Sequence, residues 1–136
     1  MIVAACVLMT QCSPHTPYAV SSSEAASVLQ LSPEKLIDAY LERLKKTSPP
    51  NPELAFIIAP NLDIQHHLEP RITAEKDDLV TSDLLFLARV VCEQHGGCSQ
   101  NRSLIEEMRK RCGQITNPSL RESACGQVDK IENRKL

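Results

Sequence analysis

Four cysteines lie close together in the last third of this 136-residue chain, and they limit how that part can fold. An even set of cysteines in a small exported protein is typical of a disulfide framework. The chain has no Trp, two Phe and two Tyr, so its core must be mainly aliphatic. A small aliphatic core gains much from covalent links. The sequence therefore predicts two disulfides among the following residues: Cys92, Cys98, Cys112 and Cys125.

The pairing has more than one solution, because four cysteines allow three connectivities. We prefer Cys92 with Cys98, since the Gly-Gly dipeptide between them permits a tight return of the chain. Cys112 would then pair with Cys125 and join the last two helices. The interlaced alternative, Cys92 with Cys112 and Cys98 with Cys125, stays open.

Zinc binding is the alternative role for these cysteines. Cys92, His95, Cys98 and Cys112 could supply four tetrahedral ligands. Their spacing differs from the paired C-x2-C or C-x4-C ligands of zinc fingers, so disulfides are preferred. We expect no resident metal or other cofactor.

Hydrophobic periodicity predicts a mostly α-helical fold, a small bundle of about four helices stapled by the disulfides. Ser82 and Asp83 are expected to cap a segment that ends before Gly96 and is apolar nearly all round, so this segment should be the central helix. Two later segments start with S-x-x-E capping boxes at Ser103 and Ser119. The four expected helices cover residues 32–46, 82–95, 103–113 and 117–131.

The segment 53–59 is short, apolar and bounded by Pro52 and Pro60. It is consistent with a buried strand or an extended packing segment, and no partner strand is evident. Apolar surface without a partner inside the fold marks contact sites. We therefore expect Phe56, Ile57 and Ile58 to form a partner-binding surface.

The chain opens with a short apolar run that ends at Cys12 and continues into a segment rich in Ser, Pro and Thr. The run is much shorter than the about 20 residues of a membrane-spanning helix. It resembles the signal peptide and lipobox of bacterial lipoproteins, and this resemblance implies export and lipidation of a cysteine. We prefer Cys12, because a composition typical of a flexible tether follows it directly. Cys6, preceded by Val-Ala-Ala, is the alternative.

The resulting organisation is a signal segment (1–12), a flexible tether (13–24) and a single helical domain (25–136). The resemblance also implies attachment to the bacterial envelope through the lipid, facing the periplasm. Ser13 stands where an aspartate would retain a lipoprotein at the inner membrane, which favours the outer membrane.

Composition and motifs favour binding over catalysis. The net charge of −2 gives no general attraction to nucleic acid. G-x-S-x-G and C-x-x-C motifs are absent, so we expect a protein that is not an enzyme. The predicted function is an envelope-anchored accessory lipoprotein that contacts a protein partner, such as a component of an envelope or secretion assembly. The alternative is an immunity, inhibitor or entry-exclusion lipoprotein that binds one exported enzyme or pilus component.

Overall fold

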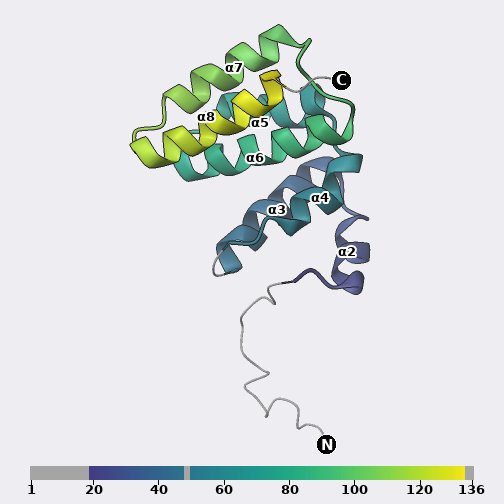
Figure 1. The fold of residues 1–136 in the computed structure, drawn as a ribbon. Coiled ribbons are helices and arrows are strands. Elements are labelled where there is room, and N and C mark those ends of the chain that lie inside the picture. The colour runs from purple at the N-terminus through teal and green to yellow at the C-terminus, as the bar shows by residue number, and fades with distance from the viewer. Residues whose placement is uncertain (1–18, 48–49, 134–136) are drawn as a thin grey trace, which may run out of the picture.

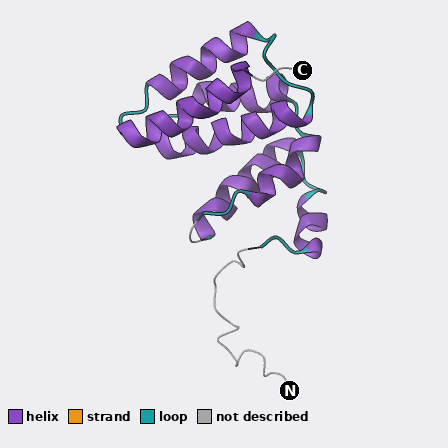
Figure 2. Cartoon of the chain, viewed as in Figure 1, coloured by secondary structure: helices purple, strands orange, loops and turns teal. Residues whose placement is uncertain are grey.

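The structure, a computed structural model, describes residues 19–47 and 50–133. These residues form seven α-helices, a 3₁₀ turn (η1) and a short π-helix (η2), without a β-strand (Figures 1 and 2). The mostly helical fold is confirmed, but the predicted number of about four helices is too low. In chain order the elements are α2 Ser22–Val28, α3 Pro33–Lys46, α4 Glu53–Ile58, η1 Ala59–Asn61, η2 Ile64–Leu68, α5 Glu69–Ala74, α6 Asp78–Gln94, α7 Arg102–Gly113 and α8 Pro118–Asn133.

The three helices that sequence reasoning missed are short. α2 has seven residues, and α4 and α5 have six each. Segments of this length span two turns or fewer, so they carry no measurable helical period, and tertiary packing must stabilise them. The strand or extended segment expected at 53–59 is wrong, since α4 and the start of η1 occupy it.

The predicted tether (13–24) is wrong at its end. Ser21 caps α2 by accepting a hydrogen bond from the Glu24 amide at 3.1 Å. The guanidinium of Arg43, which is buried on α3, pairs with the Glu24 carboxylate. Residues 22–24 therefore belong to a helix that is tied to α3. The rest of the tether up to residue 18 lies outside the described residues.

Two helix starts lie upstream of their predicted positions. α6 begins at Asp78, because the Asp77 side chain accepts a hydrogen bond from the Val80 amide at 3.0 Å. α7 is capped by Asn101 in the same way, and not by the box at Ser103. Asp and Asn are as good N-caps as Ser. Asp77 and Asn101 therefore cap these two helices in place of the predicted serines.

Helix α6 is the centre of the fold, as predicted. Figure 1 shows it lying beside α8 and α7, with α5 behind them and the α3–α4 pair on its other side. This position follows from its sequence, because buried side chains cover more than half of the circumference of the helix. They are Thr81, Leu84, Leu85, Leu87, Ala88, Val90, Val91 and Cys92. The remaining side carries partly buried residues such as Phe86 and Arg89.

The side chain of Arg111, on α7, holds the end of α5 against the bundle. Its Nε donates to the Ile72 carbonyl at 3.1 Å, and its Nη2 donates to the Glu75 carbonyl and to Thr81 Oγ1. The last carbonyls of a helix have no partner within it, so an external donor is needed where they are buried. Arg111 thus links α5, α6 and α7.

Two disulfides complete the fold, in the preferred pairing. Cys92 is bonded to Cys98, and Cys112 to Cys125, each with a Cα–Cα distance of 5.3 Å. Between the first pair, Gly96 and Gly97 have φ of 91° and 102°, values that only glycine adopts readily. The second disulfide joins α7 to α8.

Within residues 19–47 and 50–133, none of the helices combines the length and apolarity that crossing a lipid bilayer demands.

Candidate functional site

The predicted contact surface at residues 56–58 is exposed only in part. Phe56 is 46% exposed, Ile57 is half-buried and Ile58 is fully buried in the core. Successive residues of a helix point about 100° apart, so three consecutive residues cannot share one exposed face. The expectation for Ile58 is wrong because the segment is a helix. Phe56 is the member of this segment that a partner can reach most fully.

Phe56 belongs to an aromatic cluster, which we define as Tyr40, Phe56 and Phe86. The Phe56 and Phe86 rings meet edge to face, with centroids 6.0 Å apart. Phe86 and Tyr40 line the same hollow. The chain has only four aromatic residues, and three of them gather where α3, α4 and α6 meet. Their positions in the sequence carry no signal of this, because each comes from a different helix.

The hollow beside this cluster, here called the Asp83 hollow, has a volume of about 190 Å³. The hydroxyl of Tyr40 donates a hydrogen bond to the main-chain oxygen of Asp83 at 2.9 Å, and this bond fixes α3 against α6 at the hollow. Helix α8 and two prolines just before α4, Pro50 and Pro52, supply other parts of the wall. The lining residues are Tyr40, Leu44, Pro50, Pro52, Ser82, Asp83, Phe86, Ser123 and Gln127.

Ser82 and Asp83 were predicted to cap the central helix, and that role is wrong. Since α6 starts at Asp78, both residues lie more than a full turn inside the helix. Their side chains do not cap the start of α6, and they line the hollow. The earlier helix start is therefore what makes these polar groups available for binding.

The Asp83 carboxyl is the unusual group of the hollow. It is half-buried and makes no hydrogen bond or ion pair with any described residue. Burial, and secondarily the charge of Asp77, raise its pKa to about 6. Burial also raises the pKa of the Tyr40 phenol, and the nearby Asp83 adds to this, so Tyr40 stays a protonated donor.

Asp83 should make the protein more stable in mild acid than at neutral pH. A carboxyl whose pKa is higher in the folded than in the unfolded state contributes stability below the unfolded pKa, near 3.9, and loses it as pH rises through about 6. Asp83→Asn stays neutral throughout. We expect it to match the wild type near pH 4 and to be more stable by about 1 kcal/mol at pH 7.5, a value reduced from the full shift because the side chain is partly in water.

Urea unfolding of both proteins at several pH values measures this difference. An unchanged gap between wild type and Asp83→Asn across pH 4 to 7.5 would show that Asp83 does not titrate as its surroundings require.

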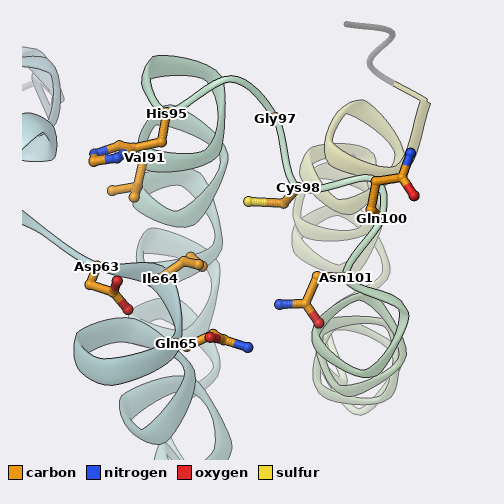
Figure 3. A pocket seen from close by; sticks show the side chains of 9 residues that line it. All are labelled: Asp63, Ile64, Gln65, Val91, His95, Gly97, Cys98, Gln100 and Asn101. Atoms are coloured by element: carbon orange, nitrogen blue, oxygen red, sulfur yellow. The ribbon is translucent and has the colours of Figure 1, made fainter.

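A second hollow, of about 320 Å³, lies beside the Cys92–Cys98 disulfide (Figure 3). Figure 3 shows Asp63, Ile64 and Gln65 on one side and Cys98 and Asn101 on the other. Its full lining is Asp63, Ile64, Gln65, Val91, His95, Gly97, Cys98, Gln100 and Asn101.

Several polar groups of the second hollow are already used by the fold. Asp63 caps η2 by accepting from the His66 amide at 2.8 Å, and Asn101 caps α7. The His95 Nε2 atom lies 3.2 Å from the Ala59 carbonyl oxygen, within hydrogen-bond distance. The carboxyl of Asp83 has no such structural use. The Asp83 hollow is therefore the better candidate site.

The alternative zinc site is not assembled. The sulfurs of Cys92 and Cys98 are bonded to each other, and that of Cys112 is bonded to Cys125, so the three cysteines are not thiolate ligands. Across the part of the chain that the structure describes, no group of three or more His, Cys, Asp or Glu side chains is placed to hold a metal ion.

The predicted lipidation residues, Cys12 and Cys6, lie outside the described residues. What the described residues define is a small helical protein with two disulfides and an aromatic-walled hollow. Comparisons with protein-family models, curated proteins and solved structures gave no match.

Proposed function

We propose that this chain is an envelope-anchored lipoprotein that acts as an accessory or binding component by contacting a protein partner. The aromatic cluster carries the proposal. Phe56 keeps 46% of its surface exposed although Phe86 packs against it, and the side chain of Arg89 lies 5.0 Å above the Phe86 ring. Aromatic and arginine side chains supply much of the binding energy at protein interfaces.

Two features support the location. The disulfides are of the kind that persist in oxidising compartments such as the bacterial periplasm. The first residues resemble a lipoprotein signal that ends at Cys12, with Cys6 as the alternative. The lipid would hold the protein at a membrane, the outer membrane by preference, and leave the helices free to meet a partner.

Site-specific photocrosslinking tests the partner. A benzophenone amino acid in place of Phe56 should give a discrete crosslinked product with one envelope protein in cells. The same group in place of Glu106, which is exposed on α7, is the matched control and should not give that product. Identical products from both positions, or none from position 56, would contradict the proposal. If the captured protein is an exported enzyme or a pilus component, the inhibitor or immunity alternative is favoured.

Lipidation gives a separate expected result. When cells take up a palmitate analogue, the wild-type chain should be labelled, and Cys12→Ser should lose the label. Cys6→Ser should keep it, since Cys12 is the preferred acceptor. Loss of label in Cys6→Ser alone would move the anchor to Cys6. Unlabelled wild-type protein found free of membranes would contradict the anchored location.

A further inference from the structure

We propose that the Asp83 hollow receives a lysine or arginine side chain of the protein partner. This inference rests on the proposed function and adds the chemistry by which the partner is recognised.

The size and walls of the hollow fit one long basic side chain. Its volume of about 190 Å³ is below the about 300 to 1,000 Å³ of typical small-molecule pockets, so it suits a single side chain. Leu44, Pro50 and Pro52 offer apolar surface for the aliphatic stem of a lysine or arginine. The ring of Tyr40 can attract a cation that approaches its face, whereas one face of the Phe86 ring is already covered by Arg89.

The polar groups of the hollow complement a cationic head group. Asp83 supplies a carboxylate without a partner among the described residues, and Ser82 and Ser123 add hydroxyl oxygens that can accept. The side-chain oxygen of Gln127 already accepts a hydrogen bond from Arg89. Lysine and arginine carry three and five N–H donors and no acceptor, so the carboxylate and hydroxyl oxygens match them. A partly buried carboxylate is costly until it is paired, and an incoming cation removes that cost.

The charges around the hollow favour the same ligand. Asp77 adds negative charge near Asp83. Arg89 also lies beside the hollow, over the Phe86 ring, where its Nε donates to Gln127. Its charge is paired, since its Nη1 contacts the Glu93 carboxylate at 2.8 Å. The pKa of Asp83, about 6 in the free chain, leaves the carboxyl mostly ionised at neutral pH.

Binding of a model side chain can be followed at Phe86 itself. The chain has only two Phe, so incorporation of 4-fluorophenylalanine gives two ¹⁹F resonances, which Phe56→Leu assigns. The full chain in detergent micelles is titrated at pH 7.5 with N-acetyl-arginine amide and with N-acetyl-citrulline amide, a neutral molecule of nearly the same shape. We expect the arginine compound to shift the Phe86 resonance with at least tenfold higher affinity than the citrulline compound.

Asp83→Asn should lower the affinity for the arginine compound at least tenfold, whereas the control Glu106→Gln should leave it unchanged. Asn keeps the size of the side chain and removes only the charge. Equal affinities for the two compounds, or an Asp83→Asn variant that binds as well as or better than the wild type, would overturn the inference. The second result would show that the Asp83 carboxylate does not recognise the cation.

Crosslinking separates this inference from the proposed function. If the product at position 56 forms equally in wild type and Asp83→Asn, the partner exists but does not use the hollow, and only the inference fails. If no partner is captured in either protein, the proposed function fails, and so does the claim that a protein supplies the side chain. A product that weakens in Asp83→Asn and not in Glu106→Gln supports both.

Discussion

Leu87→Ala is expected to lower the free energy of unfolding by about 2 to 5 kcal/mol. Leu87 is fully buried on α6, which other helices surround, so the missing atoms leave a cavity that the core cannot easily close. The loss combines the reduced burial of apolar surface with the cost of that cavity. Urea unfolding of both proteins gives the difference directly.

Leu44→Ala is the matched control, because it removes the same atoms from α3. Leu44 is 8% exposed and lies at the edge of the core, beside the Asp83 hollow. Water can reach part of the space that its side chain leaves, so the loss should be smaller than for Leu87. A larger loss for Leu44→Ala would mean that α3, and not α6, is the centre of stability.

Removal of the Cys112–Cys125 disulfide should cost about 3 kcal/mol. This disulfide closes a loop across a sequence separation of 13 residues, and the estimate is the chain entropy that a cross-link of this length removes from the unfolded state. The double variant Cys112→Ala/Cys125→Ala avoids leaving a free thiol that could form a wrong pair. Its unfolding free energy is compared with that of the oxidised wild type.

The double variant Cys92→Ala/Cys98→Ala is the control for loop length. Its disulfide spans a separation of only 6 residues, for which the same estimate is smaller, about 2.4 kcal/mol. Protein purified from the periplasm should contain no free thiol at these four positions. Four free thiols there, together with one zinc per chain, would contradict the disulfides and restore the metal alternative.

The parts of the fold that could be predicted are those specified by neighbouring residues. The stop of α6 at the Gly96-Gly97 pair and the start of α8 at Asn117-Pro118 each depend on a few adjacent residues. The preferred disulfides follow the same rule, because each joins cysteines that short turns bring together. Where two residues that favour the N-cap position lie close together, as Asp77 and Ser82 do, the neighbouring sequence does not show which of them starts the helix.

The candidate site was harder to predict. Phe56 was named as a contact residue because its segment is apolar, but the same argument also named Ile58, which the core buries. Asp83 was interpreted as part of a helix cap, and Tyr40 was covered only by the expected helix 32–46. The sequence shows that aromatic residues are scarce. Their scarcity draws attention to the Phe56–Phe86 contact, but only the structure shows that these two rings meet.

The sequence by itself determined the helical class and the long helices, because periodicity, capping and turn residues act between neighbours in the chain. It favoured one pairing of the four cysteines, and the structure decided between that pairing and the interlaced one. Only the tertiary structure decided that α4 is a helix, that Phe56 is exposed while Ile58 is buried, and that Asp83 lies beside Tyr40 and Phe86. Short helices and partly buried carboxyls depend on packing between segments far apart in the chain. Tyr40 and Asp83 are separated by 43 positions, and the hydrogen bond between them exists only because α3 packs on α6.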